Sequence, residues 1–471
     1  MPSETGEVKQ IDGLKPYKGG EELRRAAAVL AGPQSNKAPS SSRGVRRSTS
    51  NAPEQAPVAL LTEAAEPAVR ELAWAAQRYA EAAEADENDF ESVYNHGLTL
   101  QELALRAGSS QAEQLELLKQ ACSRYESAWR LRESAHAALY NWGVALSDMA
   151  HCVKASDRAA AGEFLSQAAE KYAASLQWNP SNPQALNNWG LVLQELSTMR
   201  PGAERLSLVR LAVAKFRRAI RLRPEFDRAC YNLGTVYYAY ASTLQMDAGA
   251  RMSAQLTQNA QDQASQSSEE ALVRRTFRLA SQYIALSSAL QPGKETYLAS
   301  LNVVQHLLPL PFLRVGRLQA IDPSTRNTCR ERWQTHVFVL DHQAFQSATT
   351  VQRHQYQATP PRQSLSGTPG AATTGQGMGI GDEEQAPILL SDILTVKTCQ
   401  DPSLPKGHAI WIATRDMPAG LYYVAEDRED ADGWADAMHL TVHLMSRQQL
   451  PALGNVLQPD MAISRRTTSN H

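Results

Sequence analysis

Apolar residues recur at helical spacing along the middle of the chain, in a unit that repeats four times. Each unit carries a short phrase that ends in a glycine, and these glycines are Gly97, Gly143, Gly190 and Gly234. Successive glycines lie 46, 47 and 44 residues apart. A fixed period in this range indicates stacked pairs of helices, in which one helical hairpin is copied along the chain.

A second phrase follows each glycine, with the pattern alanine, a large residue four positions on, and a small residue three further. Its copies are Ala121–Ala128, Ala168–Ser175, Ala212–Ala219 and Ala280–Ser287, and the last three run on to Pro180, Pro224 and Pro292. The two phrases together resemble the tetratricopeptide (TPR) repeat, W-x2-L-G-x2-Y, then A-x3-F, then P. The resemblance predicts a mainly α-helical, TPR-like solenoid over residues 62–308, which holds a partner and performs no chemistry.

The units are about a dozen residues longer than the ~34 of a standard TPR, so long helices are expected. An earlier half-motif, Ala75–Ala82, predicts a capping helix from Thr62 to Ala85. The insertion 248–268 is rich in Gln, Ala and Ser and lacks an apolar stripe, which favours a surface loop. The large residue just before each of the last three repeat glycines is expected to be buried, namely Trp142, Trp189 and Leu233.

An asparagine stands two residues before every repeat glycine: Asn95, Asn141, Asn188 and Asn232. Equivalent positions of a solenoid stack into a ladder, and an asparagine side chain offers both a donor and an acceptor. In some TPR proteins, such as the O-linked N-acetylglucosamine transferase, asparagines at this position line the inner groove and hold an extended peptide. The resemblance therefore favours a peptide-binding ladder. The alternative is that each asparagine bonds a neighbouring helix and sets the geometry of the repeats.

Charged residues in the repeats bear on the kind of partner. A clamp for acidic chaperone tails needs basic residues on the first helices, which instead carry Glu91, Gln101, Glu102, Gln184, Gln194 and Glu195. Their charge disfavours such a clamp. A basic cluster does exist in the third unit and the start of the fourth, comprising Arg217, Arg218, Arg221, Arg223 and Arg228. Runs of this kind are typical of a solvated face, and that interpretation is adopted for this one.

Beyond Pro292 the helical period gives way to strands. Thr296 to Leu308 predicts a last capping helix, and Asp427 to Arg447 predicts a closing helix with Trp434, Met438 and Val442 at helical spacing. The segment from Thr349 to Gln385 is rich in Gly, Thr, Gln and Pro and is expected to be a long disordered loop. Between these elements lie strand-like runs at 313–318, 333–340, 388–396, 409–413 and 421–425.

Strands followed by one helix with a tryptophan resemble a pleckstrin homology (PH) domain, here over 312–447. The resemblance rests on Arg314–Leu318 for the opening K-x-G-x-L, on Trp333–Leu340 and Ser391–Val396 for two further strands, and on Trp434. It implies a small PH-like β-barrel that the tryptophan of the C-terminal helix plugs.

Lipid-binding PH domains hold phosphates with basic side chains on the first two strands. The second strand has Gln334 and His336 at these positions, so specific, high-affinity binding is not expected. Weak contact with acidic lipid stays open through four arginines: Arg314, Arg317, Arg330 and Arg332. The alternatives are a protein-binding module and a purely structural domain.

Composition narrows the class of protein. The formal net charge of −2 argues against general nucleic-acid binding by bulk electrostatics. The five cysteines are scattered without metal spacing, as in a reducing compartment. Met1 to Lys18 has no apolar signal core, and no apolar run approaches the roughly 18 residues of a transmembrane helix. Residues 1–56 and 448–471 are expected to be tails, the first disordered.

Motifs of enzymes and cofactor sites are missing. The sequence has no P-loop, dinucleotide fingerprint, nucleophile elbow or zinc-type cysteine spacing, so no enzyme activity, cofactor or metal is expected. His439 and His443 stand at i, i+4 but lack the glutamate of a zinc protease and an obvious third ligand. A structural role is therefore predicted for both histidines.

The combination of extended TPR-like repeats with a PH-like domain resembles a family of plant TPR proteins named for hypersensitivity to latrunculin B, an actin-depolymerising drug. The phrases that carry the resemblance are Ala185–Leu191, Arg228–Thr235 and Leu307–Gly316. It implies a cytoplasmic adaptor, peripheral on trans-Golgi network and early endosome membranes, with partners in actin-linked trafficking. The alternative is a chaperone-type or assembly-factor scaffold in the cytosol or an organelle, with a purely structural PH-like domain.

Overall fold

The computed structural model describes residues 66–107, 110–254, 261–321, 332–351 and 386–458. All of them lie in one unit of the chain, Gln55–His471. The predicted N-terminal tail, most of the predicted loop 349–385 and Arg330 lie outside the described residues.

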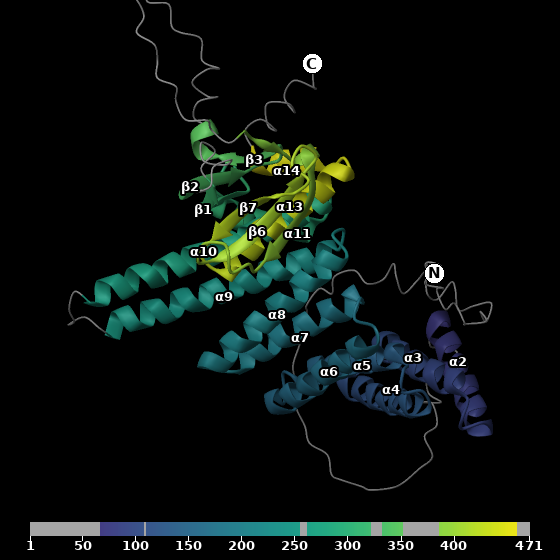
Figure 1. Ribbon diagram of the computed structural model, residues 1–471. Helices are drawn as coiled ribbons and strands as arrows, with labels where there is room; N and C mark the ends of the chain where they lie inside the picture. The colour runs from purple at the N-terminus through teal and green to yellow at the C-terminus, as the bar shows by residue number, and fades with distance from the viewer. Residues whose placement is uncertain (1–65, 108–109, 255–260, 322–331, 352–385, 459–471) are drawn as a thin grey trace, which may run out of the picture. The chain divides into compact units, whose positions relative to one another are not determined.

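Paired antiparallel helices occupy the first part of this unit, as predicted (Figure 1). Helix α2 comes before four hairpins, α3/α4, α5/α6, α7/α8 and α9/α10, and α11 with the short 3-10 helix η2 follows them. Their bounds are Pro67–Ala85 (α2), Phe90–Ala107 (α3), Gln111–Leu131 (α4), His136–Val153 (α5), Arg158–Trp178 (α6), Pro183–Met199 (α7), Gly202–Leu222 (α8), Asp227–Ala254 (α9), Gln261–Leu290 (α10), Glu295–Val304 (α11) and Gln305–Leu307 (η2).

Each hairpin is closed by the contact of its glycine with the large side chain of its second phrase. A Cβ placed on Gly97 or Gly143 would lie 2.8 Å from the ring of Tyr125 or Tyr172. The same construction on Gly190 or Gly234 ends 2.7 Å from a side-chain atom of Phe216 or Ile284. Any side chain at these four positions would push the two helices apart. The spacing of the two phrases therefore predicted the pairing of the helices correctly.

Two predictions about the repeats were wrong. The insertion 248–268 contributes to two long helices, since α9 runs to Ala254 and α10 begins at Gln261. Alanine, glutamine and methionine favour helix intrinsically, so an apolar stripe was not needed. Trp142 and Trp189 are only half-buried, since each ring faces a charged group: the ammonium groups of Lys171 and Lys215 lie 3.6 Å from the ring centroids. Leu233 is buried as expected.

A seven-stranded antiparallel sheet follows the helices, in the order β4-β3-β2-β1-β7-β6-β5. The predicted run 388–396 is divided by a 3-10 turn, and β3 was missed because it has only four residues. The strands are Arg314–Ile321 (β1), Trp333–Leu340 (β2), Ala344–Ser347 (β3), Ile388–Leu389 (β4), Ile393–Cys399 (β5), His408–Thr414 (β6) and Leu421–Ala425 (β7).

Helix α13, Arg428–Ser446, closes the sheet as the sequence predicted. Asp427 caps its first turn by accepting a hydrogen bond from the backbone N–H of Asp430. Trp434 is fully buried, and it packs over Gly316 of β1 and edge-on to Phe345 of β3. The fold is therefore a TPR-like hairpin array followed by a seven-stranded antiparallel sheet with a C-terminal helix.

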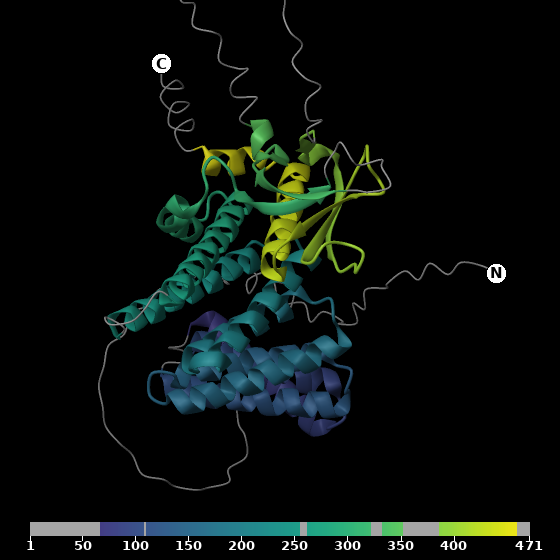
Figure 2. The same ribbon diagram turned by 60° about the vertical axis from the view of Figure 1, so that its left-hand side comes forward.

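The apolar core runs without a break from the helices into the sheet. One cluster of buried residues extends from Leu176 of α6 through α8, α9 and α10 to the strands and α13. Figures 1 and 2 show the sheet and α13 beside the last helices of the array. It also includes Leu453 and Leu457 of α14, Leu450–Leu457, a helix inside the segment that the sequence assigned to a tail. The array and the sheet module therefore share one core.

We expect Gly143→Ala to destabilise the protein by about 1–3 kcal/mol, because the added methyl group overlaps the ring of Tyr172. The matched control is Gly162→Ala in α6, where the new Cβ would lie an ordinary 3.6 Å from Sδ of Met199. Alanine favours helix over glycine by ~0.5–1 kcal/mol, so this control should be stabilised. Urea unfolding measures the stability of both variants. Equal stabilisation of the two would show that the close approach of Gly143 to Tyr172 does not restrict the residue at this position.

Candidate functional site

The asparagine ladder ties each repeat to the one before it. The side-chain amide of Asn141 donates to the hydroxyl of Tyr94 at 2.8 Å, and that of Asn188 donates to the hydroxyl of Tyr140 at 3.1 Å. Asn232 donates to Oδ1 of Asn187 at 2.9 Å. The acceptor is in every case the residue just before the asparagine of the preceding repeat. The asparagine amides therefore connect successive repeats, which is the structural role that the sequence offered as the alternative to a peptide-binding groove.

Asn95 belongs to α3, the first helix with this phrase, so no earlier copy is present to receive its amide. All four asparagine side chains are half-buried and keep some access to solvent. Further polar contacts join successive first helices, such as Gln101 to Asp148 at 3.4 Å and Lys154 to Glu195 at 2.6 Å. Burial raises the pKa of the Asp148 carboxyl to about 6.

The basic cluster predicted to be a solvated face proves in part to be an internal contact. Arg217 of α8 is only 5% exposed, and its guanidinium lies 3.0 Å from Asp436 and 3.3 Å from Asp432 of α13. Arg221, one turn later, contacts the other oxygens of the same two carboxylates at 3.1 and 2.9 Å. Two arginines therefore bind two aspartates across the junction of array and module.

Tyrosines complete this junction. The hydroxyl of Tyr283 donates to Asp436 at 2.8 Å, and the hydroxyl of Tyr237 donates to Glu429. Burial lowers the pKa of the Arg217 guanidinium, but Tyr237, Tyr283 and the carboxylates of Asp436 and Glu429 outweigh this effect, so the pKa is raised above its ordinary value. Arg218 and Arg228 are exposed, so the predicted solvated face holds for these two.

The arginines expected to contact lipid have different surroundings. Arg314 is 7% exposed; it donates to Oε1 of Gln282 at 2.7 Å, pairs with Asp430 and lies 5.0 Å from the ring of Trp434. Such burial does not suit a membrane contact. Arg317 and Arg332 are exposed.

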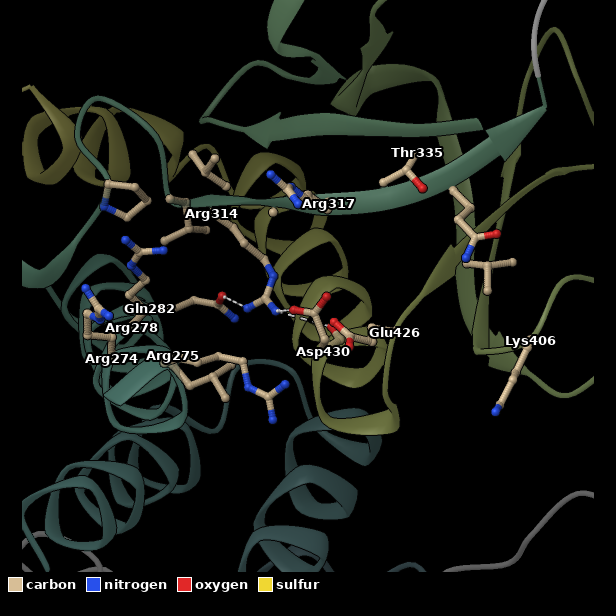
Figure 3. Close-up of a pocket in the computed structure, with 18 residues that line it drawn as sticks. Arg274, Arg275, Arg278, Gln282, Arg314, Arg317, Thr335, Lys406, Glu426 and Asp430 are labelled. Carbon is tan, nitrogen blue, oxygen red and sulfur yellow. Dashed lines mark hydrogen bonds and ion pairs between the residues drawn. The ribbon is translucent and has the colours of Figure 1, made fainter. Parts of the chain in front are cut away.

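Arg314 and Arg317 line one cavity of about 840 Å³ between α10 and the sheet (Figure 3). Three arginines of α10, Arg274, Arg275 and Arg278, line it too. Sequence patterns did not single them out, although Arg278 lies four residues after Arg274 and three after Arg275, spacings that bring side chains together on a predicted helix.

Other candidate chemistry is limited. His439 and His443 are half-buried, and burial lowers the pKa of both imidazoles. No group of three or more potential metal ligands occurs within the residues that the structure describes. Among the described helices, none is both long enough and apolar enough to cross a bilayer.

Comparisons with known proteins gave one family model and several solved structures that are similar to parts of this chain. Residues 163–273 match the family model described as plant-specific mitochondrial import receptor subunit TOM20. Solved structures with likeness include YrrB, a TPR protein with an unusual peptide-binding site, at 18% identity, with 50% of this chain and 94% of that chain covered and a TM-score of 0.27.

A TPR-repeat protein from Bacteroides fragilis is similar at 14% identity, over 51% of this chain and 93% of that chain, with a TM-score of 0.27. MamA is similar at 18% identity, over 35% and 76% of the two chains, with a TM-score of 0.26. No curated protein matches. The helical hairpins and their phrases make the chain a TPR-like repeat protein, an architecture that is typically non-catalytic.

Removing two members of the asparagine ladder should lower stability. We expect Asn141→Ala with Asn188→Ala to cost about 2 kcal/mol, on the order of 1 kcal/mol for each lost hydrogen bond. Asn95→Ala is the matched control, since it changes the same repeat position where no earlier copy exists. Thermal melting of both proteins tests this. An unaltered melting temperature in the double variant would contradict the architectural role.

Arg217→Ala should destabilise the protein by about 3–5 kcal/mol, because it removes the buried one of the two arginines that pair with Asp432 and Asp436 and leaves these buried carboxylates only partly compensated. Arg218→Ala, at the neighbouring exposed position, should change the free energy of unfolding by less than about 1 kcal/mol. Urea unfolding of both variants provides the measurement. Similar small losses in the two would mean that the junction contributes little to stability.

Proposed function

We propose that the chain is a non-catalytic scaffold that binds a protein partner on its TPR-like array. The observation that carries this proposal is a row of exposed apolar side chains at equivalent ends of three second helices. Leu131, Trp178 and Leu222 are the last residues of α4, α6 and α8, and they are 37%, 55% and 43% exposed. Each lies three residues after the small residue that closes the second phrase, so the three stack in register.

The fourth equivalent residue indicates what kind of partner fits the row. Leu290, the last residue of α10, is only 4% exposed and belongs to the same apolar core as Leu453 and Leu457. Helix α14 contacts α10, and its preceding residue Gln449 donates to the carbonyl of Leu290 at 3.3 Å. A short apolar helix of the chain itself thus covers the fourth position. We infer that the partner covers the other three with an amphipathic helix.

The asparagine ladder is a second contact surface in this proposal. Asn95, Asn141, Asn188 and Asn232 are half-buried and not sealed from solvent. An asparagine that donates through its amide nitrogen still has an acceptor oxygen, which suits the backbone N–H of an extended segment. The ladder is proposed to hold such a segment while it ties the repeats together.

The cellular setting is proposed from resemblance. We propose, from the resemblance to the plant TPR family, that the scaffold acts at the trans-Golgi network and early endosome, in membrane traffic linked to actin. The matched family model is described as a mitochondrial import receptor subunit, which favours the alternative of an assembly-type scaffold at an organelle. Live-cell imaging of the tagged full chain separates the settings. Puncta beside Golgi markers support the trafficking role, whereas mitochondrial or diffuse signal contradicts it.

The apolar row is tested by Trp178→Gln with Leu222→Gln. Proximity labelling in cells should lose at least one partner by about tenfold or more, since exposed aromatic anchors dominate protein interfaces. The control is Leu105→Gln with Met246→Gln, which changes two exposed apolar residues outside the row. Both proteins should melt like the wild type. If the row variant keeps every partner that the control keeps, the row is not the binding surface.

A further inference from the structure

The cavity between α10 and the sheet is strongly basic. Its walls carry six cationic side chains from three parts of the chain: Arg274, Arg275 and Arg278 of α10, Arg314 and Arg317 of β1, and Lys406 before β6. The acidic residues that line it are Glu426 and Asp430. Figure 3 shows the three α10 arginines on one side, Arg317 above them and Lys406 across the opening. Cations therefore surround the space from several directions.

Nearby acids neutralise only part of this charge. Arg275 pairs with Asp427, Arg314 with Asp430, and Arg274 with Glu270 at 3.5 Å on the outer part of α10. Within the described ranges, Arg278, Arg317 and Lys406 have no ion pair. Like charges that share one cavity repel one another, and an anion between them would relieve that repulsion.

Arg314 gives the cavity a fixed, preorganised wall. Its guanidinium is held between Gln282 and Asp430, and its Nε is buried with no hydrogen-bond partner among the described residues. Gly433 makes room for it, since a Cβ there would lie 2.8 Å from Nη1. The arginine thus contributes positive charge to the cavity without losing side-chain freedom when a ligand arrives.

We propose that this cavity binds a compact anion with several phosphoryl groups, of the inositol polyphosphate class. Arginine predominates among the cations, and its planar fork matches phosphate oxygens. A volume of about 840 Å³ suits a small ligand, and cations on opposite walls suit a compact anion better than an extended acidic peptide. Half of the cations come from a helix of the repeat array, so the ligand joins the array to the sheet module.

A ligand that bridges the array and the module stabilises the folded chain by mass action. This role is independent of the partner-binding row at the ends of α4, α6 and α8. The same phosphoryl chemistry occurs in a free inositol phosphate and in a phosphoinositide head group, so the test must separate these two sources.

The experiment uses the full chain and inositol hexakisphosphate at physiological salt. Calorimetry should show saturable binding, and the melting temperature should rise with ligand. Arg278→Ala with Arg317→Ala should weaken binding tenfold or more while the unliganded protein melts normally. Arg130→Ala with Arg228→Ala removes two exposed arginines outside the cavity and should leave binding unchanged.

Vesicles with and without a phosphoinositide complete the test. Sedimentation with the lipid, competed by the soluble anion and lost in the cavity variant, assigns the lipid head group; soluble binding alone assigns the free anion. Equal losses in the cavity and control variants would overturn the proposal, because the binding would then be nonspecific. Absence of binding at physiological salt, or binding of a polyglutamate peptide in its place, would overturn it as well.

Discussion

The contact of Arg217 and Arg221 with Asp432 and Asp436 joins the two parts of the folded chain. The first pair comes from the third hairpin, and the second from the helix that closes the sheet. Arg217, Asp432 and Asp436 are buried, and buried charges are costly unless each finds a partner, so we infer that the contact selects one docking geometry. The apolar core follows from that geometry, since it runs from the hairpins through α13 to the strands. A sheet module that moves freely beside the repeats is not compatible with this arrangement.

Docking divides the array into two regions. The last hairpin packs against the sheet module of the same chain, and α14 covers the apolar end of α10 at Leu290. The equivalent ends of α4, α6 and α8 keep their apolar residues exposed. The same docking places the arginines of α10 opposite β1 and so creates the basic cavity. The proposed partner surface and the proposed anion site are therefore two consequences of one interface.

Within the array, two kinds of contact act at different ranges. The fit of each glycine against a tyrosine, a phenylalanine or an isoleucine holds the two helices of one hairpin together. Amide donation from Asn141, Asn188 and Asn232 joins one hairpin to the one before it. The first contact is apolar and sets a close approach, whereas the second is directional and sets the register of stacking. The amides of these asparagines already have hydrogen-bond partners within the protein, which lowers what the proposed peptide segment gains from them.

The sequence by itself determined the hairpins, most of the strand segments and the closing helix, including Trp434 as the buried tryptophan. These features depend on residues close together along the chain, where helical and strand periods are visible. Tertiary structure alone decided which charged side chains are buried and paired with a distant residue. Arg217 meets Asp436 across 219 residues, and Arg314 turns toward Asp430 instead of a membrane. No local pattern distinguishes an arginine on a solvated face from one that pairs across a domain junction, because the partner that decides between them is brought close only by folding.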